Sequence, residues 1–148
     1  MTAADPSFVD SINLNADIRK AIGNNFDLRA LRRSINSAAT SSAEKNARAE
    51  IANGEQTVTN TVNQKYNALQ QKKAAYDSAK IAFDLEAAKT ASVQQKFSLG
   101  MASAIELKQQ LSSYSSKEAE LKNADINLFM AIEDYKWTVE KGMGGASS

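Results

Sequence analysis

The chain has no cysteine and no histidine among its 148 residues. Without cysteine there can be no disulfide framework and no thiolate metal site. Without histidine there are no Ser-His or Cys-His nucleophile pairs, no histidine-ligated zinc and no Glu-x-x-His pairs of the di-iron bundles. A phosphate-binding glycine loop and a dinucleotide glycine fingerprint are also missing. We therefore expect no enzyme, no catalytic residues, no cofactor and no metal.

Proline and glycine are scarce, with one Pro at position 6 and six Gly. So few chain-breaking residues do not suffice for the many turns of a β-sandwich or a doubly wound sheet. Hydrophobic residues make up 43% and charged residues 24%, which is ordinary for a folded chain. The sequence predicts an all-α fold of long helices, and the length favours a single domain.

Neither sign of charge dominates, since 18 basic and 17 acidic residues leave a net charge of +1. A modest basic group lies near the start and comprises Arg19, Lys20, Arg29, Arg32 and Arg33. Without interleaved aromatic residues such a group is more typical of a solvated helix face or an intersubunit salt-bridge set than of a nucleic-acid site. The longest apolar run covers only residues 128–132, far short of the roughly 20 residues that span a bilayer. We expect no nucleic-acid partner and no membrane-spanning segment.

Stop signals divide the first two thirds of the chain into two predicted helices. An amphipathic pattern predicts a short helix over about residues 8–22, interrupted near Asn13–Asn15. A long helix is predicted over about residues 25–98. The Asn-Gly pair at Gly54 lacks the alternating pattern that flanks a β-hairpin turn, so it indicates a weak point or kink within that helix.

The clearest break follows, as a tip turn over residues 99–102 that contains Gly100. A left-handed conformation is expected at this glycine, since the chain must reverse there. Ser103 and Glu106 have the spacing of a capping box, which predicts a second helix over about 103–141. Two helices joined by so short a turn lie antiparallel. Apolar residues recur at heptad spacing in the first helix, Phe97 among them, and in steps of four and three along the second helix. This pattern predicts a coiled-coil seam between the two helices.

These elements predict a single helical hairpin domain over residues 1–142, with a flexible tail at 143–148. The long helix outruns its partner, so its apolar residues Ile35, Ile51 and Val58 need cover from the N-terminal helix, another copy or both. Each helix keeps a wide polar face, and a seam this narrow does not bury a self-sufficient core. We therefore expect the chain to oligomerise into a helical bundle or tunnel.

Two carboxylates, Glu118 and Asp125, interrupt the apolar stripe of the second helix two turns apart. They could bind a cation or line a channel. The favoured interpretation is that they set the helix register or contact a basic residue of a neighbouring subunit.

The tip turn carries apolar residues where no core requires them. Leu99 and Met101 flank Gly100 at an exposed position. An exposed apolar tip is a candidate contact site, although the two side chains could also fold over the end of the hairpin. Both interpretations are open at this point.

Residues 62–142 resemble the TolC family of outer-membrane efflux ducts. The most specific stretch reads Gln95-Lys-Phe97-Ser-Leu99-Gly100-Met-Ala-Ser103-Ala-Ile105-Glu-Leu107. It is similar to the turn found at the periplasmic tip of each helix hairpin in that family, where an aromatic residue, a glycine, a Ser/Thr and an acidic residue follow in this order. The segment from Asn24 to Arg32 also resembles the opening of the family's repeat.

This resemblance implies a periplasmic tunnel segment of an efflux duct, a passive conduit associated with the outer membrane in the cell envelope. It implies two kinds of partner, further copies in a trimer or hexamer-like ring and a periplasmic adaptor (membrane fusion) protein. The adaptor-facing positions would be Leu99, Gly100, Met101 and Ser103. The chain departs from the family in having one repeat, and helical sequence stands between Leu31 and Val62 where the family carries barrel strands. A structural or interaction coiled-coil hairpin with no transport role is the alternative.

Overall fold

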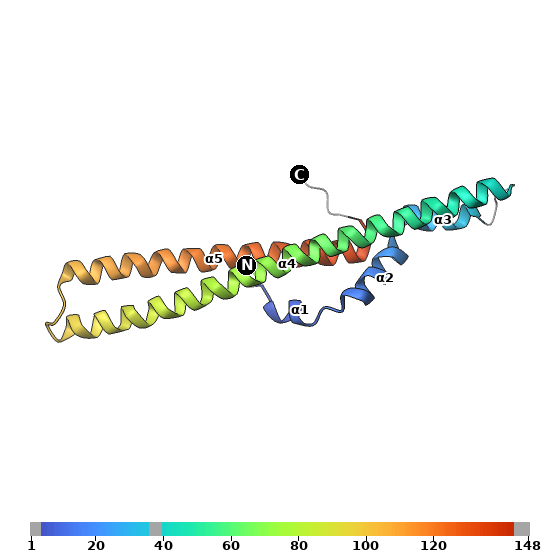
Figure 1. Cartoon of the computed structure of the whole chain (residues 1–148). Coiled ribbons are helices and arrows are strands. Elements are labelled where there is room, and N and C mark those ends of the chain that lie inside the picture. The colour runs from blue at the N-terminus through green and yellow to red at the C-terminus, as the bar shows by residue number, and fades with distance from the viewer. Residues whose placement is uncertain (1–3, 36–39, 144–148) are drawn as a thin grey trace. The chain divides into compact units, whose positions relative to one another are not determined.

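The computed structural model describes residues 4–35 and 40–143 and is almost entirely helical (Figure 1). Helices make up 90% of the described residues, and no strand occurs among them. The predicted all-α class is confirmed. The five helices are α1 (Pro6–Asp10), α2 (Leu14–Asn24), α3 (Phe26–Ile35), α4 (Ser41–Ser98) and α5 (Ala104–Lys141). Within the described ranges, no helix is long and apolar enough to cross a membrane.

The predicted N-terminal helix is two helices, α1 and α2, separated near the expected interruption. Asp5 caps α1 by accepting a hydrogen bond from the backbone N–H of Ser7 at 3.0 Å. Asn13 caps α2 by accepting one from the N–H of Ala16 at 3.1 Å. Such short polar side chains satisfy the orphan N–H groups of a first helical turn, which explains why the helix restarts at Leu14.

The prediction of one continuous helix over 25–98 is wrong, because α3 ends at Ile35 and α4 begins at Ser41. Residues 36–39 lie outside the described part. The hydroxyl of Thr40 accepts a hydrogen bond from the N–H of Ala43 at 3.2 Å and starts α4. Serine and threonine near position 40 can compete with helical backbone bonding in this way, so a helix can begin here.

The helix α3 packs on the first part of α4. A Cβ built at Gly54 would lie 2.6 Å from a methyl carbon of Leu28, which is itself only 2% exposed. Arg32 adds an ion pair with Glu55 at 2.7 Å. As expected, Gly54 makes no turn, and its missing side chain leaves room for Leu28. Val58 is 5% exposed, so this chain covers it without another copy.

The chain divides into two compact units. Unit 1 comprises residues 1–4 and 71–129, and unit 2 comprises residues 5–70 and 130–148. Most of the buried apolar side chains belong to unit 2, namely Val9, Ala21, Leu28, Val58, Val62, Leu69, Ile132, Tyr135 and Val139. In unit 1, Leu128 is the one large apolar side chain that is buried among the described residues.

Unit 1 consists mainly of the C-terminal part of α4 and the N-terminal part of α5. The rings of Phe83 and Tyr114 contact each other with centroids 5.3 Å apart. The amide of Gln110 donates hydrogen bonds to Glu86 at 2.6 Å and to Thr90 at 3.0 Å. Contacting positions rise along α4 as they fall along α5, so the two segments run antiparallel.

Candidate functional site

Backbone hydrogen bonds stabilise the turn between α4 and α5. Gly100 has a φ of +72°, so the expected left-handed glycine is confirmed. Its N–H donates to the carbonyl of Phe97 at 3.0 Å, and the N–H of Met101 donates to the carbonyl of Lys96 at 2.8 Å. This pair of bonds is the Schellman motif, which satisfies the last carbonyls of a helix. The turn is therefore held in one conformation by its own backbone.

The first turn of α5 is held by the predicted capping box. The N–H of Ser103 donates to the carboxylate of Glu106 at 2.6 Å, and the N–H of Glu106 donates to the Ser103 hydroxyl at 3.2 Å. The backbone N–H and the hydroxyl of Ser103 hold the pKa of Glu106 below its ordinary value, because hydrogen bonds donated to the carboxylate favour its charged form. Ser103 is thus engaged within the chain, as a cap.

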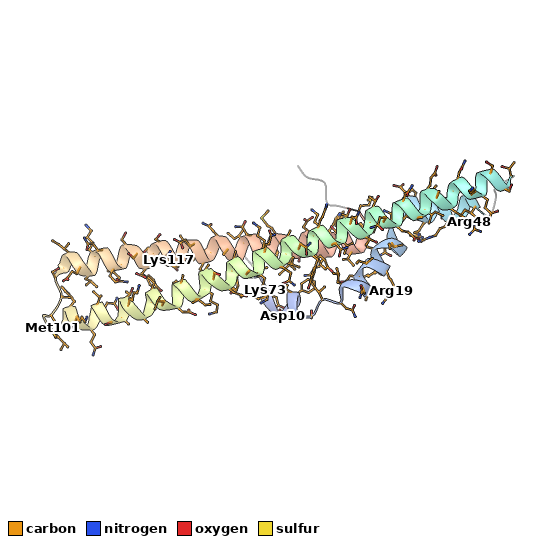
Figure 2. All side chains as sticks on the ribbon, in the orientation of Figure 1. Asp10, Arg19, Arg48, Lys73, Met101 and Lys117 are labelled. Atoms are coloured by element: carbon orange, nitrogen blue, oxygen red, sulfur yellow. The ribbon has the colours of Figure 1, made fainter. Side chains whose placement is uncertain are left out.

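The apolar residues of the turn point away from the protein. Leu99 is 66% exposed and Met101 72% exposed, and Met101 stands free at the end of the helix pair (Figure 2). They do not fold over the hairpin end, which was the alternative interpretation of the sequence. Gly100 also has open space, since a Cβ built there meets no atom within 4 Å.

Two further apolar side chains join this exposed group, and the sequence interpretation missed both as site residues. Phe97, assigned to the seam, is 43% exposed, and Ile105 is 70% exposed. Ile105 is apolar but falls outside the four-and-three spacing of the α5 seam. An apolar residue away from the seam was the sequence feature that could have identified it as exposed. We define the apolar tip as Phe97, Leu99, Met101 and Ile105.

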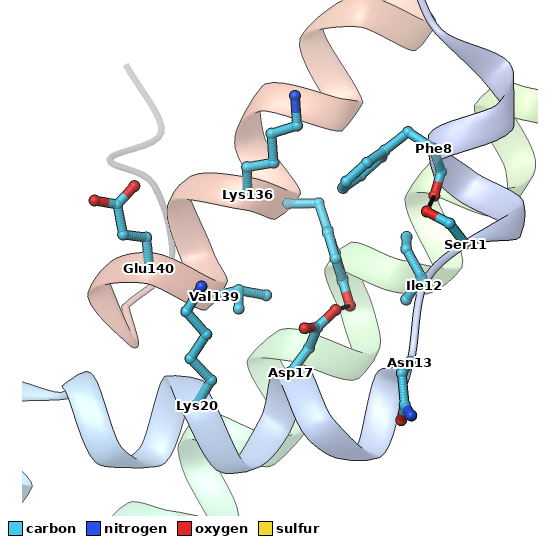
Figure 3. Close-up of a pocket in the computed structure, with 10 residues that line it drawn as sticks. Phe8, Ser11, Ile12, Asn13, Asp17, Lys20, Lys136, Val139 and Glu140 are labelled. Carbon is cyan, nitrogen blue, oxygen red and sulfur yellow. Dashed lines mark hydrogen bonds between the residues drawn. The ribbon is translucent and has the colours of Figure 1, made fainter.

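Elsewhere, unit 2 has a cavity of about 700 Å³ (Figure 3). It lies between α1, α2 and the end of α5, and its lining comprises Phe8, Ser11, Ile12, Asn13, Asp17, Lys20, Tyr135, Lys136, Val139 and Glu140. The Tyr135 hydroxyl donates a hydrogen bond to Asp17 at 2.8 Å, and the Lys136 ammonium lies 4.9 Å from the centre of the Phe8 ring. Both contacts tie the N-terminal helices to α5.

The pKa of Tyr135 is raised above its ordinary value, mainly because its side chain is buried. A second cause is the hydrogen bond that its hydroxyl donates to the Asp17 carboxylate. Both causes favour the neutral phenol. A phenol held neutral in this way donates a hydrogen bond and does not act as a base, so Tyr135 is a packing residue with a satisfied hydroxyl.

The two carboxylates of the α5 stripe have partners within the chain. Asp125 accepts a hydrogen bond from the N–H of Ala4 at 3.0 Å, and Glu118 pairs with Lys122 at 2.9 Å. No group of three or more acidic residues in the described part of the chain is placed to hold a metal ion.

Comparisons with protein-family models, curated proteins and solved structures found no match for this chain.

Proposed function

We propose that the chain is a tunnel segment of a TolC-like efflux duct, which assembles with its own copies and docks on a periplasmic adaptor protein through the apolar tip. In this proposal α4 and α5 of unit 1 form an antiparallel coiled-coil hairpin in the cell envelope. The transport role is passive, and the chain contributes surfaces and a conduit.

The observation that carries the proposal is the combination of a fixed backbone and a free apolar surface at the tip. The Schellman motif and the capping box stabilise the turn without any help from Leu99, Met101 or Ile105. Large apolar side chains that stabilise nothing in their own chain are typical of a contact site. A rigid support also lowers the entropy that a partner must remove on binding. The resemblance of residues 95–107 to the family's tip turn supports the same assignment.

A second line of support is the incomplete burial of unit 1. Its seam contains the polar group of Glu86, Thr90 and Gln110, while Ile81 and Leu85 lie on the outside. A helix pair of this kind has apolar surface left for neighbours. Assembly with further copies would cover it.

Tip docking can be tested with Leu99→Asp and Met101→Asp, using a purified adaptor protein encoded in the same genome as the probe. Both side chains are exposed, so the melting temperature should change little. Burying an unpaired carboxylate in an apolar contact costs roughly 3 kcal/mol, so adaptor binding should weaken on the order of 100-fold. Asn53→Asp is the matched control, because it places the same charge at an exposed helical position away from the tip.

Interferometry and thermal melts on the same samples distinguish the outcomes. Unchanged adaptor binding by the Leu99→Asp protein would refute tip docking, and loss of folding would place this side chain in a core. Negative-stain microscopy of the assembled protein gives an independent check. A closed ring with a central opening supports a conduit, whereas a monomer or dimer without one favours a structural coiled-coil hairpin.

A further inference from the structure

The face of α4 that points away from α5 carries an uninterrupted row of apolar and small side chains. The row, here called the α4 outer stripe, recurs in steps of four and three and comprises Ala74, Ser78, Ile81, Leu85, Ala88 and Ser92. All six are exposed, with Ile81 at 70% and Leu85 at 58%. Successive helical residues are about 100° apart, so this stripe lies opposite Phe83, which contacts α5. None of the described residues of unit 1 covers it.

A corresponding row runs along the outside of α5, opposite Tyr114. This α5 outer stripe comprises Ile105, Gln109, Ser112, Ser116, Ala119 and Asn123, and all six are exposed. Its larger side chains, Ile105 and Gln109, lie at the tip end, and serines occupy its middle. The α4 outer stripe has the reverse distribution, with Ile81 and Leu85 in its middle and Ser92 near the tip. The sizes of the two stripes are therefore complementary.

Charged residues flank the α4 outer stripe, and those nearest to it differ in sign between its two sides. On a helical projection Asp77 and Asp84 lie along one border, and Lys89 and Lys96 lie along the other. Lys73 and Lys80 lie further from the stripe and pair with the two flanking aspartates at 3.0 and 3.3 Å.

Charged residues also border the α5 outer stripe. Lys108 and Lys122 lie along one border, and Glu106 and Glu120 lie along the other. When two helices pack antiparallel through such stripes, each border faces the equivalent border of its partner. The acidic border of α4 would then face the basic border of α5, and the basic border of α4 the acidic border of α5.

We propose that the α4 outer stripe of one copy packs antiparallel against the α5 outer stripe of a neighbouring copy. The contacts within unit 1, between Phe83 and Tyr114 and between Glu86 and Gln110, fix which heights on the two helices correspond. Copies standing side by side at the same height bring Leu85 opposite Ser112 of the neighbouring copy.

The same register brings opposite charges together at both borders. Asp77 comes close to Lys122 of the neighbouring copy, and Lys89 to Glu106 of that copy. Within one chain Asp77 pairs with Lys73 at 3.0 Å and Lys122 with Glu118 at 2.9 Å. These two ion pairs join residues one helical turn apart, are partly exposed and contribute little to the stability of the chain. They therefore do not prevent Asp77 and Lys122 from pairing between copies.

Self-pairing of the α4 outer stripe fits less well. An antiparallel pair of these stripes brings the acidic borders of Asp77 and Asp84 together, which is repulsive. A parallel pair brings Asp84 near Lys89 but sets the large residues Ile81 and Leu85 against their own equivalents. Packing α4 on α5 uses two different faces of each copy, and such heterologous contacts repeat until they close a ring or extend as a filament. The inference rests on the proposed function only in that both require assembly with further copies.

Cysteine cross-linking tests the pairing directly, because the chain has no native cysteine. The Leu85→Cys/Ser112→Cys protein should form disulfide-linked dimers and larger species under mild oxidation. Within one chain these two positions point away from each other and cannot be bridged. Each single variant should stay monomeric on a non-reducing gel. The Leu85→Cys/Ile105→Cys protein is the register control, since its second position is displaced by about 10 Å along α5.

Dimers of the Leu85→Cys single variant would show that the α4 outer stripe pairs with itself, and an absence of cross-links in the Leu85→Cys/Ser112→Cys protein would overturn the contact altogether. Equal cross-linking by the register control would overturn the register.

Charge reversal tests the borders. Asp77→Lys and Lys122→Asp should each weaken association about 3- to 10-fold in sedimentation experiments, and the double variant should recover most of the loss. A double variant as weak as the two losses combined would contradict the pairing.

Adaptor binding by the same proteins separates this inference from the proposed function. If the Leu85→Cys/Ser112→Cys protein forms no cross-links while Leu99→Asp still weakens adaptor binding, the result counts against the stripe contact alone. Intact cross-linking with no effect of Leu99→Asp on adaptor binding counts against the docking function alone.

Discussion

The two left-handed glycines among the described residues should respond very differently to the same substitution. Gly100 has a φ of +72° and Gly142 a φ of +65°, so alanine at either position incurs a similar conformational cost of about 1 kcal/mol. Their surroundings are not similar. A Cβ at Gly100 meets open space, whereas a Cβ at Gly142 would lie 2.2 Å from the carbonyl oxygen of Ala21 and 2.8 Å from the backbone nitrogen of Asn25.

The additional cost at Gly142 comes from backbone atoms that cannot rotate away. Overpacking of this kind costs about 1–3 kcal/mol. The displacement also strains the buried hydrogen bond from the Asn25 amide to the Gly142 carbonyl, which measures 2.8 Å, and weakening such a bond costs about 1 kcal/mol. We expect Gly142→Ala to lose about 3–5 kcal/mol and Gly100→Ala about 1 kcal/mol.

Asparagine at the same positions separates the two causes, because it tolerates the left-handed region better than alanine but still carries a Cβ. Gly100→Asn should recover most of the loss caused by Gly100→Ala, whereas Gly142→Asn should keep most of the loss caused by Gly142→Ala, because the close approach of the Cβ remains. Urea unfolding followed by circular dichroism measures the free energy, and the single tryptophan, Trp137, reports on unit 2 separately. Equal losses at the two glycines would refute the assigned close approach.

Three further substitutions test other contacts of the fold. Leu28→Ala should cost roughly 2–5 kcal/mol because Leu28 is buried, while Ile81→Ala at low protein concentration should change the free energy of unfolding by less than about 0.5 kcal/mol. Tyr135→Phe should cost about 1–2 kcal/mol through the lost bond to Asp17. The raised pKa of Tyr135 means that its share of stability is present below about pH 10 and lost above it, so alkaline melts of the Tyr135→Phe protein should depend less on pH. The lowered pKa of Glu106 has the opposite sign: its contribution is present above about pH 4.3 and lost as the pH falls. Melting temperatures of the native protein and the Glu106→Gln protein should therefore converge in acid, and a constant difference would contradict the capping role.

The elements that the sequence predicted well are those whose signals are local. A glycine followed by a Ser-x-x-Glu spacing implies a particular backbone, and both Gly100 and the Ser103–Glu106 pair adopt it. The second helix was predicted over 103–141 and spans Ala104–Lys141. No distant residue is needed to decide any of these features.

The break between α3 and α4 depends on distant contacts, and the sequence interpretation missed it. Serine and threonine near position 40 are tolerated inside helices as well as at their ends. The break is stabilised by α3 packing on α4, through Leu28 at Gly54 and Arg32 at Glu55. Gly54 was interpreted as a weak point, and its missing side chain is what gives Leu28 its place. A single-chain pattern does not show such a partner 26 residues away.

The exposure of each apolar residue was also beyond the sequence pattern. Heptad spacing identified one stripe on each helix and placed Phe97 within it, but Phe97 is 43% exposed. The spacing of Ile81, Leu85 and Ile105 is as regular as that of the seam. Packing in the folded chain decides which of two apolar stripes on a helix contacts the other helix. The second stripe can be recognised as exposed only once the structure shows which stripe makes that contact.

Most of the buried apolar side chains lie in unit 2 and most of the exposed large ones in unit 1, although Phe26, Met130, Trp137 and Met143 are exposed in unit 2. This uneven distribution bears on function. Unit 2 buries Leu28, Leu69 and Tyr135 and caps its helices within the chain, so it has the features of a self-supporting fold. Unit 1 buries only Leu128 among its large apolar side chains in the described residues, and it holds its turn by backbone bonds. A surface that binds a partner reversibly is exposed in the free chain, so it does not supply the stability of the free chain. A helix pair with a polar seam, two outer stripes and an apolar tip is therefore better suited to assembly than to folding alone, and the stability of unit 1 should increase with protein concentration more than that of unit 2.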